Sequence, residues 1–200
     1  MHYAMREPHQ RQPDMQVTSP GYTRVAIILH WLIAAAIFST FLLGQYMTQL
    51  QLSPVKLKLY SYHKWIGVTI FLLVLFRLIW RLSHRPPAPP AGMPAWQHRA
   101  ATTAHFLLYV LTLAIPISGW LMSSASGFQV VYLGQIPIPD LVAKNKHLAE
   151  QLKEVHETLN WVMLGVVILH VAAALKHHMV DRDEILQRML PFLKKRRTPR

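Results

Sequence analysis

The chain has 200 residues, enough for one domain, and its composition of 52% hydrophobic and 15% charged residues with a mean hydropathy of +0.21 is typical of a membrane protein. It contains no cysteine, which excludes disulfides, thiolate metal sites, iron–sulfur clusters and covalently attached c-type haem. The net charge of +12 is not accompanied by a basic helix or an aromatic platform, so it does not indicate nucleic-acid binding.

In chain order, residues 1–21 are polar and contain three prolines, and we expect a flexible leader there. Four long apolar runs follow, and the first has no small-residue cleavage site of the kind that ends a signal peptide. The runs are 25–47, 65–80, 104–123 and 158–175. With their flanks they reach the roughly 20 residues that a membrane helix needs, and they predict helices at about 24–48, 61–83, 101–124 and 156–179. We therefore expect an all-α fold, an integral membrane four-helix bundle over residues 22–192, followed by a basic tail at 193–200.

The connectors differ in charge and composition. The leader, the proline-rich second connector 81–99 with its flanks, and the tail together carry 15 of the 21 Lys and Arg residues. Because basic residues remain on the cytoplasmic side of membrane proteins, this distribution predicts that both termini are cytoplasmic. In the third connector, residues 140–159 have apolar positions at helical spacing, and we expect an amphipathic helix on the outer surface there.

Seven of the twelve histidines lie within or beside the apolar runs, where an ionisable side chain is costly and indicates function. His30 is six residues after the preceding arginine and His170 is six residues before the next lysine. Both should therefore lie about 9 Å inside the cytoplasmic boundary. His63 and His156 begin their helices on the opposite side. The sequence thus predicts an inner pair, His30 with His170, and an outer pair, His63 with His156.

His156 and His170 are 14 residues apart. At about 100° and 1.5 Å per residue they share one face of a helix and are separated by about 21 Å along its axis. They cannot converge on one zinc ion, whose ligands lie within about 2 Å of the metal. Two haems, each held between imidazoles of opposing helices, fit this spacing. The alternative is that the four histidines only pack between helices. It would leave unexplained why all four lie at matching depths in the membrane.

Arg77 follows His63 by the same 14 residues, so we expect it on the same face at the depth of the inner pair. A lone arginine in a membrane helix needs an anion, and haem propionates would provide one. Alternatively, its side chain extends to the cytoplasmic interface. His105, at the cytoplasmic start of the third predicted helix, is a second candidate for contact with a propionate.

Five sequence blocks carry a resemblance to a known family. They are ILHWLI (28–33), YHKWIGVTIFLLVLFRLIWRL (62–82), HFLLYVLTLAIPISGWLM (105–122), VHETLNW (155–161) and LHVAAALKHH (169–178). In these blocks the chain resembles the bacterial cytochrome b561 family over about residues 22–192. The resemblance implies a four-helix bundle in the bacterial inner membrane that holds two b haems. It implies ligation by His30 and His170 on the inner side and by His63 and His156 on the outer side.

The resemblance also implies electron exchange with ubiquinone and, for one member, superoxide as the donor on the periplasmic side. We therefore expect a superoxide:ubiquinone oxidoreductase, that is, a superoxide oxidase. Superoxide is a small anion, so an electropositive outer mouth would steer it. Lys56, Lys58 and Lys64 are the candidates, with Lys153 as a further one, unless these are ordinary solvated lysines.

A quinone site requires a hydrogen-bond donor and a proton route near the lipid boundary. His177 and His178, about two turns beyond His170, are candidates for both, and Trp31 is a candidate for packing on the ring. The alternative is that the two histidines are interfacial residues among neighbouring basic side chains.

Two other functions compete with this interpretation. The first is a haem-b membrane anchor that passes electrons between quinone and a separate dehydrogenase or hydrogenase subunit. Such an anchor would need its partner redox protein, whereas a superoxide oxidase would act alone. The second is a histidine-lined transporter of metal ions, which would bind no haem.

Overall fold

The computed structural model describes residues 21–90 and 92–193. Four long helices dominate this part of the chain: α1 (Arg24–Gln49), α2 (Pro54–Ser83), α3 (Ala95–Ser126) and α4 (Lys146–Lys176). Each is long and apolar enough to cross a membrane. The expected all-α architecture with four such helices is therefore confirmed. The leader and the basic tail expected at the two ends fall almost entirely outside the described residues.

Three of the helices begin earlier than expected because local signals start them ahead of the apolar runs. α2 begins at Pro54 rather than at about residue 61, since Ser53 caps it by accepting a hydrogen bond from the Lys56 amide, at 3.2 Å. α4 begins ten residues before the expected position, where Asn145 accepts from the Leu148 amide at 3.1 Å. α3 begins at residue 95, directly after a proline.

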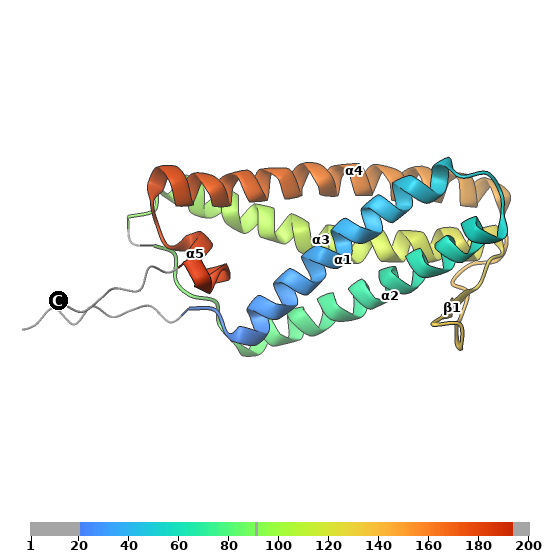
Figure 1. The fold of residues 1–200 in the computed structure, drawn as a ribbon, viewed down its shortest axis with the longest axis horizontal. Helices are drawn as coiled ribbons and strands as arrows, with labels where there is room; N and C mark the ends of the chain where they lie inside the picture. Colours follow the sequence, from blue (N-terminus) through green and yellow to red (C-terminus); the bar gives the residue numbers. More distant parts are fainter. Residues whose placement is uncertain (1–20, 91, 194–200) are drawn as a thin grey trace, which may run out of the picture.

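The amphipathic helix expected on the outer surface over residues 140–159 is not a separate element. Residues 146–159 are the first turns of α4, which runs without interruption for 31 residues (Figure 1). At about 1.5 Å per residue such a helix is about 46 Å long, whereas the apolar core of a bilayer is about 30 Å thick. The amphipathic turns are therefore the part of α4 that extends beyond the apolar core.

A short antiparallel hairpin, β1 (Val130–Tyr132) and β2 (Ile136–Ile138), follows α3 and was not expected. Strands of three residues are too short to show an alternating pattern in the sequence. The hairpin is held against α2, because the Trp65 indole donates to the Val131 carbonyl at 2.7 Å and Tyr132 shares a hydrogen bond with Thr69. It therefore covers the end of the bundle at which α2 begins.

The chain after α4 forms three short elements, a π-helical turn (His177–Asp181), α5 (Ile185–Met189) and a 3-10 turn (Pro191–Leu193). Figure 1 shows α5 at the end of the bundle where α1 begins and α2 ends. The first and last described residues thus lie at the same end of the bundle, as an even number of crossings requires.

The helices pack closely in three pairs, α1 with α2, α2 with α3, and α3 with α4. Their common core is built on Ile33, Ile70 and Val74. Ile70 and Val74 lie between His63 and Arg77 along α2, so this core separates the two levels at which functional side chains were expected. Many large apolar side chains on the outside of the helices are exposed, as lipid-facing residues are.

Candidate functional site

The outer pair predicted from the sequence comes together in the structure. The imidazoles of His63 on α2 and His156 on α4 have their ring centroids 6.3 Å apart, with the ring planes at 76°. α2 and α4 are not among the closely packed helix pairs. The two imidazoles therefore face each other between helices whose backbones stay apart.

The inner pair comes together in the same way, with a third histidine beside it. The ring centroids of His30 on α1 and His170 on α4 are 6.2 Å apart. His105 on α3 lies against the same partner, with its centroid 5.5 Å from that of His170. The inner level thus holds three imidazoles from three helices, and the outer level holds two.

Both pairs have the separation that one metal ion between two imidazoles requires. With a metal–nitrogen bond of about 2 Å on each side, and about 1 Å more from each nitrogen to its ring centre, the centroids of two axial ligands are about 6 Å apart. The observed 6.2 and 6.3 Å match this value. Bis-imidazole ligation of haem iron is therefore a good fit at both levels.

The hydrogen bonds of His156 leave its Nε2 atom free to bind a metal. Its Nδ1 lies 3.1 Å from the Ile115 carbonyl and 3.0 Å from the Ser118 hydroxyl, both on α3. Because a carbonyl only accepts, the ring proton belongs on Nδ1, and Nε2 keeps its lone pair. Metal-binding histidines are usually oriented by such a bond from the second ring nitrogen. Sequence reasoning missed Ser118, which no local pattern connects with His156.

Two glycines make room for the outer imidazoles. A Cβ atom on Gly44 of α1 would lie 3.3 Å from Cε1 of His63, and one on Gly119 of α3 would lie 3.1 Å from Cε1 of His156. The Nδ1 atom of His63 is buried without a hydrogen bond in the described part of the chain, although the Thr40 carbonyl lies near the ring. Each outer ring is therefore enclosed on one side by bare backbone, which suits a bulky planar group on the other.

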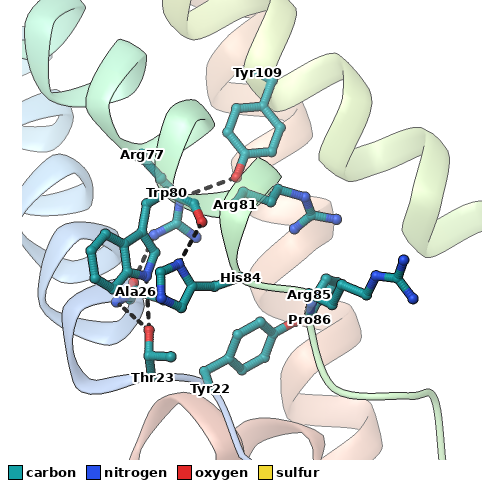
Figure 2. A pocket seen from close by; sticks show the side chains of 10 residues that line it. All are labelled: Tyr22, Thr23, Ala26, Arg77, Trp80, Arg81, His84, Arg85, Pro86 and Tyr109. Atoms are coloured by element: carbon teal, nitrogen blue, oxygen red, sulfur yellow. Dashed lines mark hydrogen bonds between the residues drawn. The ribbon is translucent and has the colours of Figure 1, made fainter.

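Arg77 lies at the inner level, where its spacing from His63 had placed it. Its guanidinium donates to the Ala26 carbonyl, at 2.8 Å, and Ala26 is one turn before His30 on α1. Its Nε donates to the Tyr109 hydroxyl at 3.2 Å (Figure 2). Tyr109 was not identified from the sequence, although it lies one turn after His105 and so shares its face of α3.

The three lysines considered for steering an anion lie on the first turns of α2, at the end that carries His63. Lys56 donates to the Leu50 carbonyl at 2.5 Å, and Lys64 donates to the carbonyl of Phe128 before the hairpin at 3.2 Å. Lys58 lies over the Tyr62 ring, 5.8 Å from its centroid. Each ammonium group therefore has a local partner, and none forms an ion pair with a carboxylate in the described residues.

The candidates for the quinone site meet the chain after α4. Nδ1 of His177 is 2.6 Å from an Asp183 carboxylate oxygen and 3.1 Å from one of Asp181. The Trp31 indole donates to a backbone carbonyl of α5, that of Met189, at 2.9 Å. The segment from the π-helical turn to α5 thus connects His177 with Trp31.

The neighbouring His178 differs from His177. Its Nδ1 is buried and has no hydrogen-bond partner within the described ranges. Asp181 also accepts a hydrogen bond from Lys176 at 2.6 Å. The two aspartates were not identified from the sequence as partners of His177, because the π-helical turn that brings them together has no regular spacing.

The chain matches known proteins over most of its length. The family model described as "Prokaryotic cytochrome b561" matches residues 21–192. The chain is 32% identical over 174 residues to "Cytochrome b561 homolog 2" of Escherichia coli, a match that covers 86% of this chain and 93% of that protein. It is 30% identical over 176 residues to "Cytochrome b561 homolog 1" of the same organism, covering 85% of this chain and 97% of that one. It is also 30% identical over 181 residues to the "Probable superoxide oxidase CybB" of Yersinia pestis, covering 85% and 96%.

Proposed function

Since the chain belongs to the prokaryotic cytochrome b561 family, we propose that it transfers electrons across the bacterial inner membrane between a periplasmic donor and ubiquinone. Membership in the family makes it a multi-pass membrane protein that binds haem b and takes part in electron transport. The proposal adds that two haems are bound, one at each level of the bundle.

The observation that carries the proposal is that two pairs of imidazoles face each other, one pair at each level of the bundle. His30 and His170 would hold the inner haem, and His63 and His156 the outer one, since both pairs have the centroid separation expected for axial ligands of one iron. When bound, the haems supply one-electron redox chemistry at two depths. The four histidines hold these groups in line, because two of them share one face of α4, 14 residues apart.

The polypeptide contributes orientation and charge. Ser118 and the Ile115 carbonyl hold the ring of His156 through Nδ1 and leave Nε2 available. Arg77 and His105 lie at the inner level and would face the propionates there, since Arg77 is tied to the turn before His30 and His105 contacts His170. An excess of positive charge at that level would favour these carboxylates.

On the periplasmic side, the donor that we propose is superoxide. The similarity to a probable superoxide oxidase supports it. So do Lys56, Lys58 and Lys64, which surround the start of α2 and lack ion-paired carboxylates in the described residues. Lysines that form no ion pair with a carboxylate would raise the local concentration of a small anion near His63, and so its rate of encounter.

On the cytoplasmic side, we propose that His177 donates a proton to the reduced quinone and that Trp31 packs on the quinone ring. The 2.6 Å hydrogen bond to Asp183 orients the His177 imidazole and connects it to an acidic residue at the protein surface. A π-helical turn of this kind occurs frequently at functional sites. His178, buried beside it with an unpaired Nδ1, is a second candidate for a hydrogen bond to quinone.

The proposal is tested on the purified protein by a dithionite-reduced minus oxidised spectrum and by the haem-to-protein ratio. We expect two haems per chain and bis-imidazole b-type spectra. Superoxide should reduce the haems, and ubiquinone should reoxidise them, without any other protein. A protein that binds haem but needs a dehydrogenase or hydrogenase subunit to be reduced would instead be a membrane anchor. A protein without haem would contradict the whole proposal.

A further inference from the structure

A pocket opens at the end of the bundle that carries the chain ends, and Figure 2 shows the residues that line it. It is a shallow pocket, and the space among its residues is about 400 Å³ when the part open to the surroundings is included. The wall consists of the beginning of α1 with the two residues before it, the last turns of α2 and the connector that follows, and Tyr109 of α3. This pocket lies toward the chain ends from Arg77, and apart from Arg77 its lining residues have no part in the electron path proposed above.

Its charge is strongly positive. Arg77 and Arg81 are four residues apart on α2, a spacing at which like charges repel, and Arg85 follows just beyond the end of the helix. Residues 15–139 contain no aspartate or glutamate. The three helices that line the pocket therefore provide no carboxylate to neutralise these arginines, and an external anion would do so.

Some residues of the pocket are held by stacking or hydrogen bonds, and two guanidinium groups are left to bind a ligand. Trp80 and His84 are stacked with their rings 4.0 Å apart, and the Trp80 indole donates to the Thr23 hydroxyl at 3.0 Å. Arg77 is occupied by its two hydrogen bonds. Arg81 lies over the Tyr109 ring, 5.8 Å from its centroid, and neither Arg81 nor Arg85 makes a hydrogen bond or ion pair within the described residues.

The depth of these two arginines distinguishes them from Arg77. Arg77 lies at the level of His30, and Arg81 is one turn closer to the end of the bundle, or about 6 Å, where it lies over the Tyr109 ring. Arg85 lies further out, beyond the last residue of α2. Tyr22 and Trp80, which also line the pocket, are the aromatic residues that favour the boundary between lipid and water. The guanidinium group of Arg85 is therefore at the depth of lipid headgroups, and that of Arg81 lies between this depth and the inner histidines.

We propose that this pocket binds the phosphate of an anionic phospholipid, with Arg81 and Arg85 as its ligands. A guanidinium group binds phosphate through two parallel hydrogen bonds. Basic pockets between membrane helices on the cytoplasmic side bind such headgroups. The wall formed by Trp80, His84 and Thr23 sets the shape of the site, and the lipid phosphate offsets the repulsion between the arginines.

The test uses the haem-loaded protein in a neutral detergent. Native mass spectrometry measures how strongly one phosphatidylglycerol molecule is retained, compared with phosphatidylcholine. We expect phosphatidylglycerol to bind about tenfold more tightly, and the double variant Arg81→Gln/Arg85→Gln to lose this preference. Arg99→Gln removes an exposed charge from the start of α3 at the same end of the bundle and should leave the preference unchanged.

The single variant Arg85→Gln lies beyond the end of α2 and should reduce the preference even if the double variant does not fold. Equal retention of the two lipids by the unmodified protein would overturn the proposal. Displacement of phosphatidylglycerol by millimolar inorganic phosphate would show a site for free phosphate instead. A double variant that keeps its lipid preference but loses an inner haem would identify a propionate as the anion. Because lipid retention does not depend on electron transfer, its failure is separate from a failure of the proposed function.

Discussion

At the scale of single residues, the ability of an imidazole to bind a metal depends on which of its two nitrogen atoms has no hydrogen bond. The polar partners of His156 all approach Nδ1, from the Ile115 carbonyl and Ser118 of a neighbouring helix. A histidine that served only to pack helices together would gain by using both nitrogens. His156 satisfies one nitrogen and leaves the other without a hydrogen bond in the described residues, beside the ring of His63, as a metal ligand would.

Replacing His156 with alanine should remove one haem and leave the other, because the inner pair shares no residue with the outer one.

Ser118→Ala should keep both haems but weaken retention of the outer one on the order of tenfold, since the His156 ring loses part of its orientation. The haem-to-protein ratio before and after dilution into haem-free detergent measures both effects. A His156→Ala protein with two haems would contradict the assignment.

Two glycines give a second test at this scale, with a matched control. A methyl group on Gly119 would lie 3.1 Å from the His156 ring, whereas one on Gly165 of α4 would meet no atom within 4 Å. Gly119→Ala should therefore shift the outer imidazole and reduce the binding of the outer haem. Gly165→Ala should leave haem content unchanged and stabilise the helix by up to about 1 kcal/mol. Identical haem content in the two variants would argue against a close fit around His156.

At the scale of elements, the chain after α4 acts as a connector between two helices. Its π-helical turn presents His177 to Asp183, and α5 supplies the carbonyl that holds the Trp31 indole of α1. The turn ends at Arg182, which adopts a left-handed backbone conformation with φ of 54°. This sharp reversal returns the chain toward the bundle and positions Asp183 beside a histidine six residues earlier.

Asp183→Asn should slow quinone reduction on the order of tenfold or more, because His177 loses the carboxylate that orients it and supports its positive charge. Haem content should not change, since His177 is not at either histidine pair. Glu184→Gln removes an exposed charge next to Asp183 and serves as the control. The rate of quinone reduction is measured with a ubiquinone analogue. Equal rates in the two variants would show that Asp183 has no role in quinone reduction.

At the scale of the whole molecule, charge is divided between the two ends of the bundle. One end carries Arg77, Arg81 and Arg85, with Asp181 and Asp183 in the chain after α4, and the other carries the lysines at the start of α2 and the acidic residues of the third connector. Such an asymmetry sets the orientation of a membrane protein during insertion. If the arginine end is cytoplasmic, as this rule predicts, it lies where anionic lipid is most abundant.

This asymmetry predicts the orientation directly. A reporter protein that is active only in the cytoplasm should be active when fused to the C-terminus, and one that is active only in the periplasm should be active when inserted after Gly134 in the hairpin turn. The reciprocal pair of fusions is the control. The opposite pattern would place the arginine pocket and the quinone candidates on the periplasmic side.

By itself, the sequence determined the number of membrane helices, the two depths at which histidines lie and the shared face of His156 and His170. These follow from composition and from helical periodicity, which act along one chain segment. Helix ends were predicted less well, since caps such as Ser53 and Asn145 lie outside the apolar runs. The hairpin was missed because its strands are three residues long.

Only the tertiary structure decided which side chains of different helices meet. No pattern in the sequence connects Ser118 with His156, Gly44 with His63, or Tyr109 with Arg77. Helical periodicity gives the face on which a residue lies, but the rotation and tilt of each helix against its neighbours depend on packing across the bundle. The sequence predicted that His105 lies on the cytoplasmic side as a candidate contact of a propionate, but only the packing of α3 against α4 shows that its ring lies against His170.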